Sequence, residues 1–549
     1  MTSDSSPPSL LHKRIYGTAG LTVLVAFYLL TGLVGHDPWR GDDARYFGPI
    51  HSMLQGEGWL FPAIGGLAFP DFPPLYYWTA ALLAGLTGGL LPAHDGARLA
   101  SAVFTAMAIY WIARACERLY GRPSRTPAAL LTMGTLGLVL HAHETQPLIA
   151  LTAMFALTLN GLARVPQQPV GGSLQAGLGS ALAFLAGGVP GALLTLPLFL
   201  LVAAATPECR TPRASGGLLA GLCLAAGVGA AWPLAVHLLQ PEAFSLWLAH
   251  EWANLGGAPL GADEGGSLIE LLGWAIWPLW PIALWALWRH RRDLSALRWL
   301  LPTLGIVLAV VLLWLRGDLS PTLALPLIPP FAMLAAGGAP TLRRGAANAF
   351  DWFAVMCFAV FAALVWIAWT AQAYAWPPGL ARHIARLTPG FELGEGLLQP
   401  ALGIAICLIW ILLVWRLPRS TTRGPANWAM GMTMLWCLAV VLLMPWFDHG
   451  RSYRPVVQSL SQALAGEPPG CIATTTLPDA LRSSLDYFGG IRPRTAHSGS
   501  TPCRLLLLYA DRRPGIQEPA PEWQTVWEYR RGGGKQLEHF RLYRLTDDH

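Results

Sequence analysis

Long apolar runs recur along most of the chain and alternate with short polar segments. A helix that crosses the hydrocarbon core of a membrane needs about 20 mostly apolar residues, and runs of this kind predict about 13 spanning helices. The apolar stretch 75–92 is interrupted by glycines, and we expect it to form a helix on the membrane surface. The predicted spans lie near residues 15–34, 98–117, 127–142, 146–163, 174–189, 190–206, 216–239, 268–288, 297–315, 322–341, 350–372, 397–415 and 427–446.

Composition supports the same class. Charged residues make up 12% of the 549 residues, hydrophobic residues 54%, and the mean hydropathy is +0.43. A soluble domain carries about 25% charged residues. A soluble enzyme, a disordered protein and a nucleic-acid-binding protein are therefore excluded as descriptions of the whole chain. The sequence predicts a polytopic α-helical membrane protein.

The placement of basic residues predicts the orientation, because short cytoplasmic loops retain Lys and Arg. With a cytoplasmic N-terminus, eighteen basic residues fall at cytoplasmic helix ends and six in the opposite loops. An odd number of spans then places the C-terminus outside. The first span lacks a small-residue cleavage site, so we expect a retained helix and no signal peptide. The six outward residues are Arg40, Arg45, Arg98, Arg316, Arg382 and Arg386.

The composition changes after Trp446, where Arg, Glu, Asp and Pro become frequent. We predict a membrane domain over residues 1–448, with an outward loop at about 35–97. A small periplasmic α/β domain is predicted over 449–549. Its β-like runs are Leu505–Tyr509 and Phe540–Leu545, and its helical segment is Tyr453–Ala465.

The eight cysteines form no C-x-x-C pair, which gives no support to a zinc or redox motif. Cys471 and Cys503 are the two cysteines of the predicted outer domain. An oxidising exterior would allow them to form a disulfide. Two buried free thiols are equally compatible with the sequence.

The outward loop after the first span contains the adjacent carboxylates Asp42 and Asp43, followed by Arg45 and Tyr46. A carboxylate held at the membrane surface can deprotonate a hydroxyl or amine, which is general-base chemistry. The alternative is a solvated loop in which the two acids pair with Arg40 and Arg45.

Two motifs in this loop resemble a known family. Asp42–Tyr46 is similar to an Asp-Glu-x-Arg-Tyr element, and Pro73–Trp78 to a Lys-Pro-Pro-Leu-Tyr-Tyr-Trp element. Both are typical of GT-C integral membrane glycosyltransferases of the lipid A aminoarabinose transferase and protein O-mannosyltransferase type. The resemblance continues in order over roughly residues 10–465. Further matching elements are His141–Pro147, Phe184–Pro190, Trp247–Glu251 and Leu315–Pro326.

The resemblance implies a GT-C fold and an inverting glycosyltransferase at the outer face of a bacterial inner membrane. The donor would be a polyprenyl-phosphate (undecaprenyl-phosphate) sugar, and the acceptor a lipid glycan, a cell-envelope glycan or a protein. Asp42 would be the general base, and Asp43 would hold the acceptor or the loop. Arginines would stabilise the leaving phosphate. The expected substrate-binding residues are Arg45, Tyr46, Arg98, His143, Glu144, His250, Glu251 and Arg316.

The chain contains only two lysines, Lys13 and Lys535. Three lysines that the family places at the outward face correspond here to Phe72, Gly187 and Asp318. The donor site must therefore be rebuilt from arginine or histidine, or it is weakened, or the donor class is altered. A degenerate homologue that acts as a lipid-binding or scaffold protein is the alternative.

Two other hypotheses have less support. A membrane transporter usually carries ionisable groups near the bilayer midplane, whereas the acids and histidines here concentrate in outward loops. A metal site at His250 and Glu251, with Asp263 and Glu264, lacks the H-x-x-x-H spacing, so no metal is assigned. No cofactor and no nucleic-acid partner are expected, and a divalent-cation requirement stays open.

Overall fold

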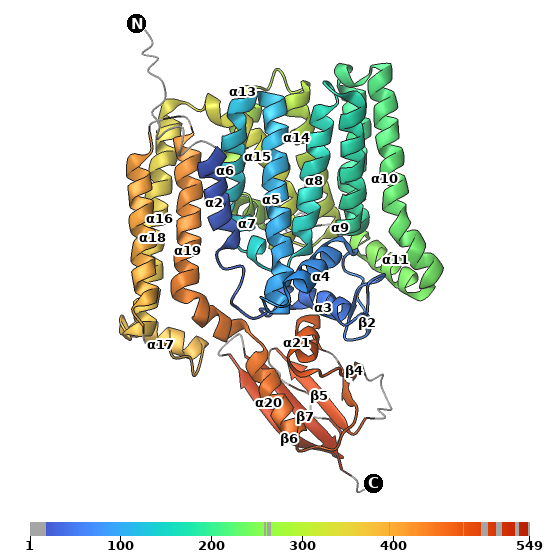
Figure 1. The fold of residues 1–549 in the computed structure, drawn as a ribbon, viewed down its shortest axis with the longest axis vertical. Coiled ribbons are helices and arrows are strands. Elements are labelled where there is room, and N and C mark those ends of the chain that lie inside the picture. Colours follow the sequence, from blue (N-terminus) through green and yellow to red (C-terminus); the bar gives the residue numbers. More distant parts are fainter. Residues whose placement is uncertain are drawn as a thin grey trace.

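A computed structural model of the chain consists of a helical bundle and a smaller α/β part that lies at one end of it (Figure 1). The acids Asp263 and Glu264, Lys13, Lys535 and the beginning of the predicted span 15–34 lie outside the described residues. The structure describes residues 18–549 except 257–259, 261–264, 395, 419, 421, 476, 496–502, 512–515, 517–518, 533–536 and 547–549.

The bundle establishes a multi-pass membrane protein. Within the described residues, nine helices are long and apolar enough to cross a membrane, or ten if the bent pair α12 and α13 forms one span. The α-helices of the bundle, the long ones and the short ones together, are α2 (Thr18–Leu30), α3 (Asp42–Leu54), α4 (Leu75–Thr87), α5 (Ala93–Tyr120), α6 (Arg125–Met133), α7 (Leu136–Val139), α8 (Pro147–Arg164), α9 (Pro169–Ala205), α10 (Pro212–Leu239), α11 (Pro241–Leu255), α12 (Gly265–Ala275), α13 (Leu279–Arg289), α14 (Leu297–Arg316), α15 (Ile328–Gly338), α16 (Arg344–Ala373), α17 (Pro378–Leu387), α18 (Leu398–Arg416) and α19 (Arg423–Arg451).

Part of the difference from the predicted 13 spans comes from α9, which contains two of them. Gly188 has a φ of 62° and interrupts the helical backbone. A side-chain carbon at Gly191 would lie 2.2 Å from the carbonyl oxygen of Ala183. Residues eight apart in one straight helix are separated by about 12 Å along its axis. The chain therefore reverses at Gly188, and the two arms of α9 form a helical hairpin.

The remaining difference comes from segments that are broken, bent or only partly described, so the nine long helices do not contradict the predicted count of about 13. The segment 127–142 is divided between α6, α7 and a 3-10 turn at His141–His143. The segment 268–288 bends by 100° between α12 and α13. The described part of the first span, Ala19–Leu30, is shorter than a full crossing. Local apolar composition does not reveal such bends.

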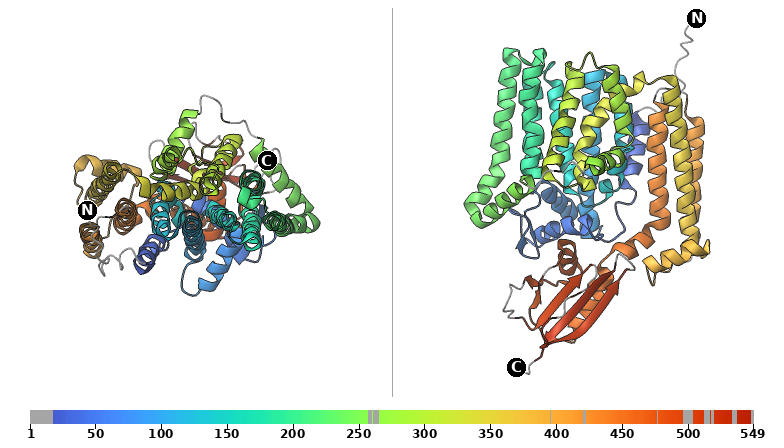
Figure 2. Two further views of the ribbon diagram at one scale, coloured as in Figure 1. Left: turned by 90° about the horizontal axis from the view of Figure 1, so that it is seen from above. Right: turned by 180° about the vertical axis from the view of Figure 1, so that it is seen from behind.

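The functional end of the bundle is built by short elements. Helix α5 packs against α4 and α8, and α3 packs against α21 of the C-terminal part. The helices α3 and α4 lie at the end of the bundle that faces this part, which agrees with the surface position predicted for 75–92 (Figure 1). Helices α16, α18 and α19 form one flank of the bundle, and α9 and α10 form the opposite one (Figure 2).

The C-terminal part contains a five-stranded sheet with the order β4-β3-β5-β7-β6. Strand β3 pairs in parallel with β4 and β5, whereas β7 pairs antiparallel with β5 and β6. The predicted β-like runs and helix are confirmed. The elements are β3 (Ile472–Thr474), β4 (Arg494–Thr495), β5 (Leu505–Ala510), β6 (Trp523–Arg531), β7 (Glu538–Leu545), α20 (Arg454–Leu464) and α21 (Asp479–Gly489).

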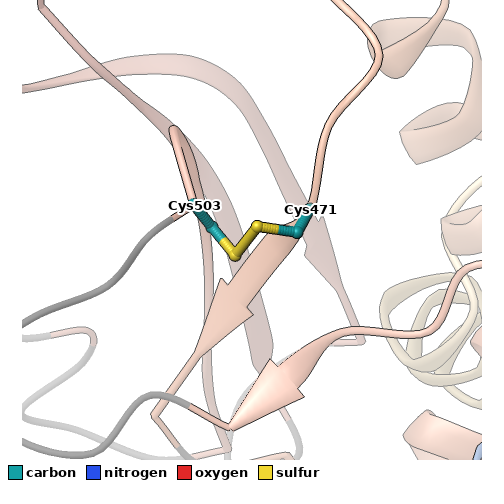
Figure 3. Close-up of a disulfide and its surroundings, with 2 residues drawn as sticks. All are labelled: Cys471 and Cys503. Carbon is teal, nitrogen blue, oxygen red and sulfur yellow. A yellow bond between two sulfur atoms is a disulfide. The ribbon is translucent and has the colours of Figure 1, made fainter.

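Cys471 and Cys503 form a disulfide, the first of the two alternatives that the sequence left open (Figure 3). Cys471 immediately precedes β3, and Cys503 lies two residues before β5. The bridge therefore connects the beginnings of two neighbouring parallel strands.

Replacing both cysteines, with Cys471→Ser and Cys503→Ser, should destabilise the C-terminal sheet. The bridge spans a sequence separation of 32 residues. Closing a loop of this size stabilises a domain by about 3–4 kcal/mol through the entropy of the unfolded chain. Pulse proteolysis in increasing urea should show cleavage of the C-terminal part at a lower urea concentration. Unchanged cleavage would show that the sheet does not depend on the bridge.

Candidate active site

The loop that precedes α3 is organised by a buried ion pair between Asp43 and Arg98. Arg98 Nη2 donates to Asp43 Oδ2 at 2.8 Å, and Nε donates to Oδ1 at 3.3 Å. The same carboxylate accepts the backbone N–H groups of Trp39 and Thr145. Both side chains are essentially inaccessible to solvent. Asp43 thus ties the beginning of α3 to α5 and to the loop before α8.

The position of Arg98 differs from the one expected of a phosphate ligand. Its Nη1 donates to Asp95 Oδ1 and to the His36 carbonyl, and its Nη2 also donates to the Asp37 carbonyl. With the two bonds to Asp43, all five guanidinium N–H donors are engaged. Arg98 is therefore a structural clasp, and it has no free donor for a lipid phosphate.

The charge of Arg98 also fixes the protonation state of Asp43. Burial alone would raise the pKa of this carboxyl group. The charge and hydrogen bonds of Arg98, with the N–H of Thr145, outweigh the burial and hold the pKa of Asp43 well below its usual range. Asp43 stays ionised at physiological pH and cannot act as an acid or base there.

Asp42 points differently from its neighbour and lines a cavity of about 640 Å³. Its Oδ2 accepts a hydrogen bond of 3.0 Å from Gln146 Nε2. Gln146 is fully buried and follows Thr145, so the segment His141–Pro147 lies against the first outward loop, as the resemblance implies. Asp42 is half-exposed and oriented by a buried amide, an arrangement suited to receiving a proton from a bound ligand.

Arg45 lies one helical turn after Asp42, between two carboxylates. Its Nη2 is 2.7 Å from Asp71 Oδ2, and its Nε is 3.3 Å from Asp479 Oδ2. The guanidinium also lies over the rings of Tyr46 and Phe69, at 5.7 and 5.6 Å from their centroids. About a third of the Arg45 side chain is exposed. Arg45 is accessible to an anion, which would have to compete with Asp71 and Asp479.

Asp71 has an unusual protonation equilibrium. Burial raises the pKa of its carboxyl group to about 6, although Arg45 opposes the shift. His250 Nε2 lies 3.9 Å from its other oxygen. Arg316 opposes the raised pKa of Asp71, and the pKa of His250 is lowered first by burial and then by Arg316. The structure therefore gathers Arg45, Tyr46, His250 and Arg316 around a carboxylate that the sequence analysis did not single out.

Glu251 follows His250 in the chain, and its carboxylate stabilises the turn of the α9 hairpin. Its carboxylate accepts the N–H of Val189 at 3.2 Å and the indole N–H of Trp247 at 3.1 Å. A side-chain carbon at Gly188 would lie only 1.9 Å from Glu251 Oε1. Burial raises the pKa of Glu251 to about 7, against the effect of the Val189 N–H, Arg316 and Trp247. The glycine is thus required both by its positive φ and by the approach of Glu251.

His143 and Glu144 lie away from the Asp42 cavity. The His143 ring is buried between the carbonyl groups of Val139 and Tyr28 and stacks on Trp436 at 4.5 Å. The Glu144 carboxylate is 3.5 Å from His141 Nδ1 and 7% of the residue is exposed. These contacts are those of packing residues, whereas the sequence predicted that His143 and Glu144 bind substrate.

The three positions that lack the family lysines have other contacts. Phe72 is buried, with its ring 5.5 Å from that of Tyr46. Gly187 packs against Leu151, and Asp318 is exposed and accepts the Ser320 N–H at 2.9 Å. None of these contacts supplies a cation. Across the residues that the structure describes, no group of three or more His, Cys, Asp and Glu side chains could hold a metal ion.

Known proteins resemble this chain in part of the sequence and in nearly the whole fold. Undecaprenyl phosphate-alpha-4-amino-4-deoxy-L-arabinose arabinosyl transferase 1 of Pseudomonas fluorescens (strain Pf0-1) is 25% identical over 268 residues, 46% of each chain. The corresponding transferase of Edwardsiella ictaluri (strain 93-146) is 29% identical over 251 residues, 43% of this chain and 44% of its own. The matched part spans a little under half the length of these relatives. No family model matches the chain.

The structural similarity is more extensive. The crystal structure of ArnT from Cupriavidus metallidurans bound to undecaprenyl phosphate has a TM-score of 0.69, covers 95% of this chain and 97% of its own, and is 17% identical. Its apo form gives the same score. The chain therefore has the fold of the ArnT structures, which agrees with the predicted polytopic helical membrane domain followed by a C-terminal α/β part. The resemblance to lipid A aminoarabinose transferases is confirmed by both the curated relatives and the ArnT fold.

The Arg98→Met variant should unfold at a clearly lower temperature than the wild type. It leaves the Asp43 carboxylate buried without a counter-charge, which costs about 3–5 kcal/mol. The double variant Asp43→Asn with Arg98→Met removes both charges and should recover part of the loss. Thermal unfolding of the purified protein in detergent measures both effects. Equal melting temperatures for the single variant and the wild type would contradict the clasp.

Binding of an anionic lipid near Arg45 should strengthen as the pH falls from 7.5 to 5.5. Protonation of Asp71, whose pKa is about 6, removes the charge that competes for the guanidinium. For a partly exposed ion pair we expect up to about a fivefold gain, which corresponds to ~1 kcal/mol. Fluorescence titration with a phosphodiester lipid tests this, because the lipid's charge is constant over the range. Asp71→Asn should bind tightly throughout, and an unchanged pH dependence in this variant would exclude Asp71.

Proposed function

We propose that the protein is an inverting glycosyltransferase that moves a sugar from a polyprenyl-phosphate donor to a hydroxyl or amine acceptor. One observation carries this proposal: Asp42 is half-exposed and lines a cavity, whereas the adjacent Asp43 is consumed by a buried clasp. A loop built only for stability would not need the second carboxylate in this position. The arabinosyl transferase activity for which the curated relatives are named and the ArnT-like fold support the same reaction class.

In the proposed reaction, Asp42 accepts the proton of the acceptor group as its oxygen or nitrogen attacks the anomeric carbon. The bond between that carbon and the donor phosphate oxygen breaks, and polyprenyl phosphate leaves with the bonding electrons. The new glycosidic bond forms on the opposite face of the sugar, which inverts the configuration. Gln146 holds one Asp42 oxygen and leaves the other free to receive the proton.

The leaving phosphate needs positive charge as the bond breaks. Arg45 and Arg316 are the candidates, because Arg98 has every donor engaged. Arg45 would exchange one carboxylate partner for the phosphate. Arg316 makes no ion pair with any residue that the structure describes, and its field reaches Tyr46, Asp71, His250 and Glu251. His250 would contribute a further donor from the same side.

The proposed location follows from the distribution of basic residues. Asp42, Arg45 and the C-terminal part lie at the same end of the bundle (Figure 1). The arginine-rich predicted cytoplasmic ends lie at the other. We therefore place the cavity at the periplasmic face of a bacterial inner membrane, with the N-terminus in the cytoplasm. The acceptor would be a component of the cell envelope.

Asp42→Asn should reduce transfer by at least about a hundredfold, the usual contribution of general-base catalysis. The amide keeps an oxygen for Gln146, so the fold and donor binding should be retained. The assay uses purified protein in nanodiscs with radiolabelled undecaprenyl-phosphate sugars and an extract of envelope lipids and glycans. Asp293→Asn, at the opposite end of the bundle, is the matched control. Full-rate transfer by Asp42→Asn would exclude the assigned base.

A second candidate function is a catalytically silent, lipid-binding homologue. The neutralisation of Arg45 by Asp71 and Asp479 favours it, as do Phe72, Gly187 and Asp318 at the positions of the family lysines. The same assay separates the two functions. Retained binding of undecaprenyl phosphate with no transfer from any labelled donor would favour the silent protein.

A further inference from the structure

A groove of about 590 Å³ separates α13 from the first part of α16, in the half of the bundle that points away from the C-terminal part (Figure 1). Trp277, which precedes α13, and Trp285 lie on one wall, and Phe353 lies on the other. Trp285 Nε1 donates to Thr341 Oγ1 at 3.1 Å, close to the beginning of α16. The rings of Trp277 and Phe353 are 5.8 Å apart at the other end of the groove. The two walls are therefore joined at both ends.

The inner end of the groove cannot close on itself, because a buried tryptophan of α19 holds its aromatic wall. The Trp428 ring stacks with that of Phe350 at 5.8 Å and with that of Phe353 at 5.9 Å. Trp428 is 4% exposed, and its indole N–H donates to the Gly134 carbonyl group at 2.6 Å. Empty space beside such a wall would forfeit dispersion contacts. In a membrane we expect a lipid chain to occupy the groove.

The depth of the groove corresponds to one leaflet of a bilayer. Arg343 immediately precedes α16, and Phe353 follows it by ten residues, which is about 15 Å along the helix axis. The hydrocarbon core is about 30 Å thick, so one leaflet contributes about 15 Å. Among the described residues that line the groove, Arg343 is the only charged one, and it lies at the outer end, two residues after Thr341. The shape fits one acyl chain with its headgroup beside Arg343.

The outer end of the groove has an excess of positive charge. Arg343 is exposed, and it makes no ion pair with any residue that the structure describes. Two carboxylates at this end of the bundle, Asp293 and Asp351, are paired with Arg298 and Arg423. An anionic group can therefore approach Arg343 without displacing a carboxylate.

A second hollow, of about 350 Å³, continues this basic surface. It is lined by residues 289–293 at the end of α13, and four of these five residues are arginine or histidine. It begins one helical turn after Trp285. Trp288, at the same level, is 64% exposed, and tryptophan is typical of the membrane–water interface. The headgroup region beside the groove is therefore basic.

We propose that the groove between α13 and α16 binds one anionic phospholipid, in the leaflet that is cytoplasmic in the orientation proposed above. One acyl chain lies between the aromatic walls, and the headgroup phosphate contacts Arg343. A zwitterionic headgroup adds an ammonium group that the surrounding arginines repel, so binding favours a lipid with a net negative charge. A polyprenyl chain is longer than one leaflet is deep and fits the groove less well. The site lies at the opposite end of the bundle from Asp42, and it goes beyond the proposed glycosyl transfer.

The test uses the full-length protein in phosphatidylcholine nanodiscs. Each preparation contains a small share of a probe lipid with a photoreactive diazirine at the end of one acyl chain, either phosphatidylglycerol or phosphatidylcholine. After irradiation, mass spectrometry of peptides compares the labelling of α13 and α16 with that of α10 on the other flank (Figure 2). Relative to α10, phosphatidylglycerol should label α13 and α16 at least about fivefold more than phosphatidylcholine, which is the usual contribution of one basic residue to binding an anionic headgroup.

Two pairs of variants locate the site. Arg343→Gln should reduce the preference for phosphatidylglycerol at least about threefold. Arg416→Gln, which changes an exposed arginine at the end of α18, should leave the preference unchanged. Ala349→Trp places an indole in the groove and should remove most of the labelling of α13 by both probes. Ala405→Trp, at an exposed position of α18, is its control and should not change the labelling.

Three results would overturn the inference: equal labelling by the two probes, an unchanged preference in Arg343→Gln, or unchanged labelling in Ala349→Trp. Thermal unfolding verifies that the four variants fold. Undecaprenyl phosphate at the concentration of the probe should not displace phosphatidylglycerol, and displacement would overturn the choice of a phospholipid. The transfer assay with Asp42→Asn does not depend on any of these results, so the two proposals are tested separately.

Discussion

The buried pair of Asp43 and Arg98 is the constraint on which the outward end of the molecule depends. Two charges removed from water are stable only when their hydrogen-bonding groups are satisfied. Arg98 satisfies this condition by binding the carbonyl groups of His36 and Asp37 as well as two carboxylates. The first loop is thereby fixed to α5 from several directions. The neighbouring Asp42 gains its orientation from this anchoring, because its own contact with Gln146 could not hold the loop alone.

A competition between anions defines the chemistry around Arg45. The sequence predicts that Arg45 binds phosphate beside Asp42, the proposed general base, and in the structure the Arg45 guanidinium contacts Asp71 and Asp479. The two carboxylates neutralise the charge of Arg45, which lies near the low-dielectric surface of the membrane. A phosphate that binds Arg45 must therefore interact with the guanidinium more strongly than the carboxylate that it displaces. Arg316 is the more important candidate for binding the phosphate, because no carboxylate among the described residues forms an ion pair with it.

The sequence alone predicted the class of protein, most helices and the strands at 505–509 and 540–545. These features depend on local composition and on short motifs. It failed where a contact depends on distant residues. Arg98 was predicted to bind phosphate, because nothing local shows that five acceptors converge on it. Asp71 was overlooked, since its raised pKa arises from burial by segments far along the chain. The sequence also did not show that the segment 127–142 is divided between α6 and α7 or that 268–288 bends by 100°, because apolar composition carries no information on a bend.

The contact of Asp37 with Arg454 and Ser452 joins residues more than four hundred positions apart in the chain. It has a consequence for biosynthesis. The first outward loop leaves the ribosome early, but its partners are made only after the last membrane helix has been inserted. During that interval the loop lacks the backbone bridge between Trp39 and Ser452 and the ion pair at Asp37. A chain that stops before α20 would therefore carry the motif residues of the first loop without these contacts to hold them.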